Sequence, residues 1–491
     1  MPRTGRTELL LIDGRLVPAS DGGTFDNVNP ATEEVLGSTA DGTSEDMDGG
    51  IAAARKAFDN TSWSTDPAFR VHCLRQLQAA LIKNADQLKA DLVAEIGTPV
   101  VLTGGPQFDT PVEGVGWVAD LSERYAWEVE LGEAPGPTGT SRRLLRREPV
   151  GVVGAITPWN FPTQINLAKV APALAAGCTV VLKPAPDSPW AATALGRIVA
   201  EETDIPAGVL NVVASSRHEI GHQLAADPRV DMVSFTGSTA TGRAVMSAAA
   251  QNLTKVFLEL GGKSALIALD DADPATAAVT AAFHITTHAG QGCAILSRLL
   301  VPRARYEATL TTLVETLRGW PYGDPTDPST LMGPLISEHQ RRRVLSYVER
   351  GVAEGARIAL GGGIPAARPR GWFVEPTVLA GVRENDTVAQ EEIFGPVLCV
   401  IPYDGGDDEA VRIANNSAYG LSGGVISASP ERAQAVARRL RVGTVSVNGG
   451  NYYGFDVPFG GYRNSGIGRE SGVAGFEEYL QIKAMAEAVR G

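Results

Sequence analysis

Cys293 is the residue of this 491-residue chain best suited to act as a nucleophile. It lies in HAGQGCAILSR, where a helical pattern gives way to a loop flanked by glycines. Glycines let the backbone approach a ligand closely and leave a thiol accessible, as a nucleophilic cysteine requires. A single cysteine is more often a small core residue, so the prediction depends on the residues that accompany it.

Two further side chains offer complementary chemistry. Glu259 ends an apolar run in LELGG, where a buried carboxylate is costly unless it is used, and it could act as a general base. The amide of Asn160, in TPWNFP, can donate a hydrogen bond to a developing oxyanion without titrating. A thiol, a carboxylate and an amide donor are the groups that acyl transfer needs.

The elements that must position these groups begin at Val150. Short apolar runs rich in β-branched residues alternate there with helical stretches: VGVVGAI, CTVVLK, GVLNVV, VDMVSF and KVFLEL. Continuous apolar runs joined by helical crossovers predict parallel strands in a doubly wound sheet, buried on both faces. Such sheets bind ligands beyond the carboxyl ends of their strands. The residues that fall there are Asn160, Lys183, Gly237 with Ser238, and Glu259. Together with the thiol of Cys293, a carboxylate base, an amide donor and a nucleotide-binding sheet edge predict oxidation of a carbonyl through a thioester.

The remaining chain reads as packing elements. Asp13-Gly14 suits a type I′ turn of a hairpin between 8–12 and 15–17. Apolar residues at helical spacing predict one helix around 47–58 and a second from 74 to a stop at Gly97. A crossover helix is predicted to open with Ser188 as N-cap and Pro189 at the first helical position. A second α/β series follows Gly262, and 479–488 could be an edge strand.

Composition limits the class of protein. The chain is 44% apolar and 20% charged, its four cysteines form no CxxC pair, and its formal charge is −13. These values predict a soluble cytoplasmic protein with reduced thiols, no membrane span, no nucleic-acid partner and no structural zinc. The pairs His218/His222 and His284/His288 lack a completing carboxylate, so we expect no metal. Neither GxGxxG after a strand nor a complete P-loop is present.

Seven motifs, in order along nearly the whole chain, resemble those of the NAD(P)-dependent aldehyde dehydrogenase superfamily. They are PWNFP at 158–162, KPA at Lys183, FTGS at Phe235, LELGGKS at Leu258, GQGC ending at Cys293, EEIFGPV at Glu391 and PFGGYRNSGIGRE at Pro458. The resemblance implies an α/β fold with a doubly wound cofactor domain (1–127 and 149–258), an α/β catalytic domain (259–464) and a small β oligomerisation element. That element would combine a hairpin (128–148) with a C-terminal strand (476–491) in a homodimer or homotetramer.

The resemblance also implies roles for individual residues. Cys293 would attack the aldehyde, Asn160 and the Cys293 backbone N–H would hold the oxyanion, and Glu259 would activate the water that hydrolyses the thioester. Lys183 and Glu392 would hold ribose hydroxyls of the cofactor. The further cofactor contacts would be Ile156, Pro158, Trp159, Gly237, Ser238, Leu260, Gly261 and Phe394.

A few residues bear on the cofactor and substrate preferences. Pro186 stands where many NAD-preferring relatives carry a glutamate, which leaves NADP as an alternative. NAD is predicted because no arginine or further lysine flanks this turn to hold a 2′-phosphate. The resemblance places Phe161, Gln164, Ala168, Thr287, Tyr453 and Phe459 in the substrate tunnel. The polar members Gln164, Thr287 and Tyr453 favour a small or polar aldehyde.

Two alternatives to oxidation of an aldehyde to the acid are a coenzyme A acylating enzyme and a catalytically silent homologue. A relative that passes the acyl group to coenzyme A generally lacks the carboxylate at Glu259, and a catalytically silent homologue has no reason to keep a buried carboxylate beside a thiol. Both alternatives are therefore less favoured than hydrolysis.

Overall fold

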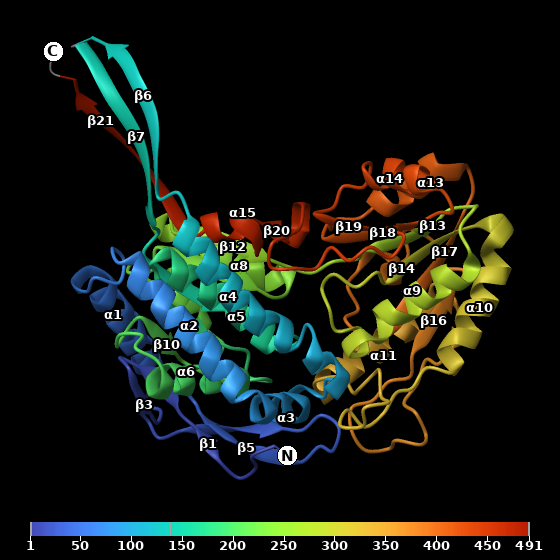
Figure 1. Cartoon of the computed structure of the whole chain (residues 1–491). Coiled ribbons are helices and arrows are strands. Elements are labelled where there is room, and N and C mark those ends of the chain that lie inside the picture. The colour runs from blue at the N-terminus through green and yellow to red at the C-terminus, as the bar shows by residue number, and fades with distance from the viewer. Residues whose placement is uncertain (1, 138, 490–491) are drawn as a thin grey trace.

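The computed structural model describes residues 2–137 and 139–489 and contains two large sheets side by side (Figure 1). The first has eight strands in the order β20-β12-β11-β8-β9-β10-β2-β3. Its strands are β2 (Leu10–Ile12), β3 (Arg15–Val17), β8 (Val152–Ile156), β9 (Thr179–Lys183), β10 (Leu210–Val212), β11 (Met232–Thr236), β12 (Lys255–Glu259) and β20 (Gly466–Ile467). The strands from β12 to β10 pair in parallel, as the sequence predicts.

Helices cover both faces of this sheet. They are α1 (Ser44–Asn60), α2 (Pro67–Lys83), α3 (Ala85–Ile96), α4 (Asp109–Arg124), α5 (Pro162–Ala176), α6 (Trp190–Glu202), α7 (Glu219–Ala226) and α8 (Thr239–Ala249). Adjacent strand residues pack into different apolar clusters, Val152 on the α1 side and Val153 on the α5 side. Burial on both faces explains why the strand sequences are continuously apolar.

The second sheet has seven strands in the order β15-β16-β17-β14-β13-β18-β19. Its strands are β13 (Ala265–Ala268), β14 (Arg298–Pro302), β15 (Arg357–Leu360), β16 (Thr377–Ala380), β17 (Val397–Tyr403), β18 (Ser422–Ile426) and β19 (Thr444–Val447). Its helices are α9 (Pro274–Thr286), α10 (Tyr306–Arg318), α11 (Glu338–Ala353), α12 (Thr387–Gln390), α13 (Gly406–Asn415) and α14 (Pro430–Ala437). This is the second α/β series that the sequence predicts after Gly262.

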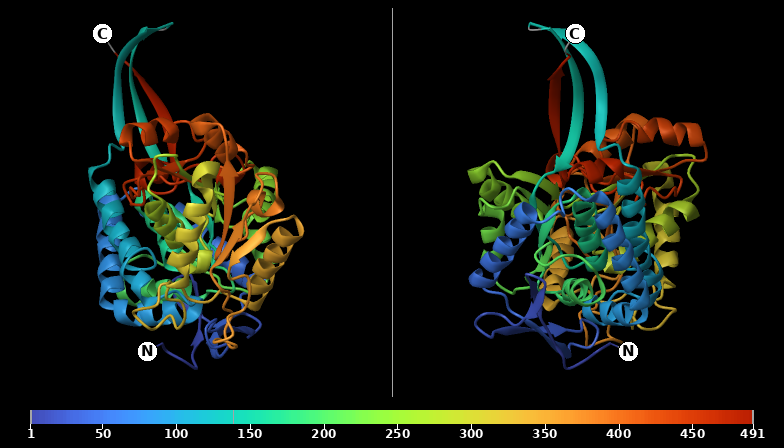
Figure 2. Two further views of the ribbon diagram at one scale, coloured as in Figure 1. Left: turned by 90° about the vertical axis from the view of Figure 1, so that its right-hand side faces the viewer. Right: turned by 60° about the vertical axis from the view of Figure 1, so that its left-hand side comes forward.

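A three-stranded sheet projects from the body of the molecule (Figure 2). Its strands are β6 (Glu128–Gly136), β7 (Gly139–Pro149) and β21 (Leu480–Ala488), which follows the short helix α15 (Gly472–Glu477). β7 is the central strand, and β21 pairs with it from Leu480 opposite Pro149 to Ala488 opposite Ser141. The C-terminal segment is therefore a strand, paired within its own chain.

A smaller sheet at the N-terminal end contains β1 (Thr7–Glu8), β4 (Thr24–Val28) and β5 (Val35–Ala40). The predicted hairpin is confirmed as β2 and β3, with Asp13 at φ 48° and Gly14 at φ 74° in the turn. Among the described residues, no helix combines the length and the apolar character needed to cross a membrane.

Two helix predictions are wrong in detail. The second predicted helix is divided at Asn84, because the Asn84 side chain donates back to the Ala80 carbonyl and to Glu202 and so interrupts the helical run. Helix α6 starts at Trp190 without a side-chain cap from Ser188. Its first N–H groups instead donate to the buried carboxylate of Glu95, at 2.6 Å from Trp190 N.

Candidate active site

The loop that carries Cys293 lies after α9 and has an unusual backbone. His288 (φ 46°), Ala289 (φ 52°) and Gly290 (φ 72°) are three consecutive left-handed residues. Such residues are strained and persist only where their surroundings hold them. Gln291 does this, because its Nε2 donates to the His288 carbonyl and its Oε1 accepts from Ile336 N at 2.9 Å.

Cys293 is the one partly exposed cysteine of this chain, since Cys73, Cys178 and Cys399 are buried. Burial of the site raises the pKa of the Cys293 thiol, and the charges of Glu259, Glu392 and Glu470 raise it further. The thiol therefore rests protonated, and its use as a nucleophile requires a base that takes the proton.

Asn160 follows β8 directly and points to the cysteine loop. Its Nδ2 donates to the carbonyl of Gln291 at 2.9 Å, and its backbone carbonyl accepts from Gln107 Nε2 at 3.1 Å. An amide nitrogen has two N–H groups, so one remains to donate to a ligand held at Cys293. The structure brings Asn160 and Cys293 together as the sequence predicts.

Glu259 ends β12, the neighbour of β11, and is 1% exposed. Neither carboxylate oxygen has a hydrogen-bond partner in the described part of the chain. Burial raises the pKa of Glu259 well above its ordinary value, the charge of Glu470 adds to this, and Lys169 and Arg469 oppose it. A raised pKa makes this carboxylate a stronger base than an ordinary exposed glutamate.

A buried ion pair that the sequence did not predict lies behind Glu259. Lys169 of α5 is fully buried and forms an ion pair with Glu470 at 3.1 Å, while its Nζ also donates to Ser234 Oγ at 3.2 Å. Lysine in an apolar helix sequence, NLAKVAPAL, was the signal that could have identified it. The pair places one positive and one negative charge beside the candidate base.

The ends of β8, β9 and β11 lie beside one another and hold the candidate cofactor groups. Register places Ile156 opposite both Lys183 and Phe235. Lys183 Nζ donates to the carbonyls of Pro184 (3.1 Å) and Ser215 (3.4 Å) and has no ion-pair partner in 2–137 and 139–489. Burial lowers the pKa of Lys183 to about 8. A buried ammonium group without a carboxylate is suited to donate to ligand hydroxyls.

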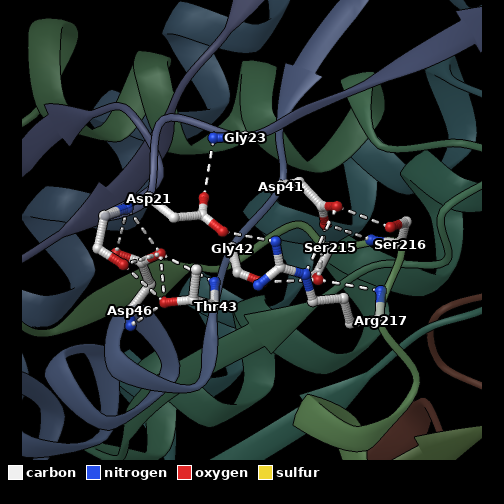
Figure 3. A network of polar contacts seen from close by, with 10 residues as sticks. Asp21, Gly23, Asp41, Gly42, Thr43, Asp46, Ser215, Ser216 and Arg217 are labelled. Carbon is white, nitrogen blue, oxygen red and sulfur yellow. Dashed lines mark hydrogen bonds and ion pairs between the residues drawn. The ribbon is translucent and has the colours of Figure 1, made fainter.

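The segment beside Lys183 is fixed by the polar network of Figure 3. Asp41 accepts from Ser215 Oγ at 2.9 Å and from Ser216 Oγ at 2.8 Å. Arg217 donates to Asp21 at 2.7 Å and lies 3.7 Å from Asp41. These contacts bind the N-terminal segment to the loop after β10. They hold Ser215 in place, whose carbonyl accepts a hydrogen bond from Lys183 Nζ.

Glu392, between α12 and β17, lies against the glycine turn that follows β12. One oxygen accepts from Gly262 N at 2.9 Å, and burial raises the pKa of Glu392 to about 7. Phe394, two residues on, has φ 63° and packs edge-to-face on Trp159 at 5.3 Å. Gln340 Nε2 holds this strained residue by donating to its carbonyl at 2.7 Å.

The other predicted cofactor contacts lie at the same edge. Ser238 is the N-cap of α8 and accepts from Thr241 N, and the nearby Gly237 N donates to the Glu259 carbonyl at 3.0 Å. A Cβ on Gly261 would lie 2.3 Å from Glu392 Oε2, and a Cβ on Gly242 would lie 2.4 Å from Leu260 Cδ2. Pro158 is half-buried beside Trp159. An ammonium donor, a carboxylate acceptor and a close glycine backbone fit a dinucleotide with ribose hydroxyls.

The predicted substrate residues divide into two groups. Gln164, Ala168, Tyr453 and Phe459 line one cavity between α4, α5 and the C-terminal loops. Phe161 instead packs edge-to-face on His288 at 5.5 Å. Thr287, the second residue outside the cavity lining, donates through Oγ1 to the Phe283 carbonyl at 2.7 Å.

The aldehyde dehydrogenase family matches residues 16–485. A 3-succinoylsemialdehyde-pyridine dehydrogenase from Pseudomonas sp is 44% identical over 479 residues, covering 96% of this chain and 97% of that protein. Geranial dehydrogenase from Castellaniella defragrans is 41% identical, covering 93% of this chain and 94% of its own.

Solved structures show the same fold. An aldehyde dehydrogenase from Mycobacterium tuberculosis complexed with NAD+ has a TM-score of 0.93 and 40% identity, covering 98% of both chains. Betaine aldehyde dehydrogenase from Staphylococcus aureus, also in complex with NAD+, has a TM-score of 0.94 and 35% identity, covering 98% of this chain and 94% of that chain. The chain described here therefore belongs to the aldehyde dehydrogenase family of oxidoreductases.

Proposed function

We propose that this chain oxidises an aldehyde to a carboxylic acid with NAD as the hydride acceptor, through a thioester on Cys293. The observation that carries the proposal is the convergence of three groups on one loop. The thiol of Cys293 is partly exposed, and the Asn160 amide donates to the carbonyl of Gln291, two residues before it. The carboxyl of Glu259 has no hydrogen-bond partner among the described residues, and its charge raises the pKa of the Cys293 thiol.

The first step is addition of sulfur to the carbonyl carbon. The Cys293 thiol gives up its proton, and Glu259, whose charge affects the thiol pKa more than any other charge, is the group suited to receive it. A carbon–sulfur bond forms, and the carbonyl oxygen becomes an oxyanion. The Asn160 Nδ2 and the Cys293 backbone N–H donate to that oxygen, which stabilises charge that exists only after attack.

When bound, NAD+ would supply the two-electron acceptor for oxidation of the adduct to a thioester. Lys183 and Glu392 would hold its ribose hydroxyls, with Phe394 against the nicotinamide ribose. Trp159 and Ser238 also help to seat the adenosine and pyrophosphate. The support is that Lys183 has no acidic partner among the described residues, and Glu392 uses one oxygen on Gly262 N.

Hydrolysis of the thioester completes the reaction. Glu259, which has released the thiol proton to solvent, takes a proton from water, the water oxygen bonds to the acyl carbon, and the carbon–sulfur bond breaks. The acid is released, and the Cys293 thiolate takes the proton back from Glu259. The raised pKa of Glu259 matches a group that gains and loses a proton in each cycle. Lys169 and Glu470 hold opposite charges beside it, so they position and tune this carboxyl group.

NAD is proposed over NADP because two solved relatives were crystallised with NAD+. The presence of Glu259 favours water over coenzyme A as the acyl acceptor. The named relatives act on a pyridine-bearing semialdehyde and on geranial, so related substrates are reasonable first members of a panel.

The test is NADH formation at 340 nm against aliphatic, aromatic, hydroxy and amino aldehydes and semialdehydes. It is run with NAD and with NADP, and with and without coenzyme A. We expect turnover with NAD in the absence of coenzyme A and one acid released per NADH. Turnover that requires coenzyme A would replace hydrolysis with acyl transfer, and no turnover with either cofactor would overturn the proposed function.

A further inference from the structure

Gln164 and Ala168 line a cavity that is called the α4–α5 cavity here. It encloses about 620 Å³ of empty space, part of which is open solvent. Its inner end lies at the site, because Glu470 lines the cavity and its charge raises the pKa of Cys293. Tyr453 also lines it, and the charge of Cys293 acts on the Tyr453 pKa.

One wall of the α4–α5 cavity is formed by α4 and α5, and several of the lining residues on these helices have small side chains. Gln164 and Ala168 are four residues apart on α5 and therefore share a face, with Ala171 a turn further on. On α4, Gly114 and Trp117 face the same space. Ala168 is half-buried, so this wall leaves volume instead of filling it.

The opposite wall is aromatic. Phe455 lies against α4 so closely that a Cβ on Gly114 would be 2.4 Å from the ring. Tyr453 and Phe459 are in edge contact, with ring centroids 6.0 Å apart. These rings, and Trp117 on the α4 side, offer flat apolar surfaces, which prefer a ring or an extended apolar body as a partner.

The lining of the α4–α5 cavity contains almost no charged side chains. No lysine, arginine or histidine is among the described residues that line it, and the single charged side chain that does is Glu470. The exposed acids Glu113 and Asp456 each lie beside a lining residue. Glu470 is paired with Lys169, which does not itself line the cavity. A ligand carboxylate in this cavity would therefore lose its hydration without gaining an unpaired cation, which is costly.

Building on the function proposed above, we propose that the preferred substrates are uncharged aldehydes whose carbonyl is attached to an aromatic ring or a comparably bulky apolar body. Aldehydes with a distal carboxylate are rejected. This lining is more apolar than the one expected from Gln164, Thr287 and Tyr453. The difference arises because Trp117 and Phe455 were not identified in the sequence and Thr287 does not line the α4–α5 cavity.

Three aldehydes test the proposal with the wild-type enzyme and NAD. Acetaldehyde lacks the apolar body, benzaldehyde has it, and 4-carboxybenzaldehyde adds a distal anion to the same ring. We expect kcat/KM for benzaldehyde to exceed that for acetaldehyde by about tenfold or more, as burial of a ring predicts. We expect kcat/KM for 4-carboxybenzaldehyde to be at least about a hundredfold below that for benzaldehyde.

The outcomes separate the two proposals. If acetaldehyde or 4-carboxybenzaldehyde is oxidised as efficiently as benzaldehyde, the substrate class is wrong and the dehydrogenase function stands. If no aldehyde yields NADH, the proposed function itself fails.

A variant locates the binding surface. Ala168→Trp fills the α4–α5 cavity from α5, so we expect the ratio of kcat/KM for benzaldehyde to that for acetaldehyde to fall about tenfold. Ala308→Trp is the matched control, because Ala308 is exposed on α10, on the far side of the second sheet (Figure 1). An unchanged ratio in a folded Ala168→Trp enzyme would show that the substrate does not lie against α5. If this variant does not fold, the wild-type panel still decides the proposal.

Discussion

At the scale of single residues, Cys293 is the group on which the proposed chemistry depends. Cys293→Ala removes the nucleophile, and we expect kcat to fall by more than about a thousandfold, because no other described side chain at the site can form the thioester. NAD binding, measured by calorimetry, should persist. Cys73→Ala is the control, since Cys73 is buried in the core and should tolerate the change with its activity intact. Turnover that survives in Cys293→Ala would overturn the nucleophile assignment.

Glu259 should affect the second half of the reaction more than the first. Glu259→Gln preserves the shape and removes the base, so hydrolysis of the thioester should slow by about a hundredfold or more. Stopped-flow absorbance should then show a burst of about one NADH per subunit, followed by a slow steady rate, because the first reduction precedes hydrolysis. An unchanged steady-state rate would exclude Glu259 from the base role.

Lys183 and Glu392 predict the pH dependence of cofactor binding. The pKa of Glu392 is raised to about 7, so below that pH its carboxyl is protonated and loses its capacity as an anionic acceptor. The pKa of Lys183 is lowered to about 8, so above that pH it loses its charge as a donor. The dissociation constant for NAD, from quenching of protein fluorescence, should therefore be lowest between about pH 7 and 8.

Variants assign the two limbs of that profile. Glu392→Gln should remove the rise in the dissociation constant on the acid side, and Lys183→Met should remove the rise on the alkaline side. A profile that is flat in the wild-type enzyme would contradict both assignments.

At the scale of elements, the backbone of the cysteine loop predicts a specific sensitivity. Gly290 has φ 72°, and a Cβ there would lie 2.1 Å from the Gly395 carbonyl oxygen. Gly290→Ala should therefore displace the loop, lower the free energy of unfolding by about 1–3 kcal/mol and reduce activity strongly. Thermal unfolding and steady-state kinetics measure the two effects.

The control for this prediction is Gly355→Ala. Gly355 also has positive φ (104°) but nothing lies within 4 Å of the added Cβ. It should cost about 1–2 kcal/mol of stability through backbone strain and leave activity intact. Equal activity in Gly290→Ala and Gly355→Ala would show that the fit between the cysteine loop and Gly395 is unimportant.

At the scale of the whole molecule, the projecting sheet predicts self-association. Its outer strands β6 and β21 have unpaired edges, and Leu131, Ile482 and Met485 are 48%, 66% and 43% exposed. Exposed edges with apolar side chains are uncommon in monomers. We propose a homodimer or homotetramer, and light scattering after size exclusion should give two or four times the 51.5 kDa mass of the chain.

Ile482→Lys should weaken this assembly and lower the measured mass at low protein concentration. Leu253→Lys is the control, because Leu253 is 93% exposed but does not belong to the projecting sheet. A wild-type mass of 51.5 kDa at all concentrations would contradict the assembly proposal.

Local sequence pattern was enough to predict the main strands and helices and the placement of the polar groups on one sheet edge. Apolar runs and helical spacing follow from burial on one or two faces, which is a local property of each segment. Parallel pairing then brings every strand's carboxyl end to the same edge, so the positions of Asn160, Lys183 and Glu259 along the chain were sufficient to predict that they lie together. The seven motifs, in their order along the chain, were sufficient to predict the family.

Features that depend on residues far apart in the chain could not be predicted from local pattern. Lys169 and Glu470 are 301 positions apart and meet because α5 packs beside the C-terminal segment. The capping of α6 by Glu95 and the closure of the α4–α5 cavity by Phe455 have the same origin. Contacts of this kind follow from how whole elements pack, and local sequence pattern does not encode them.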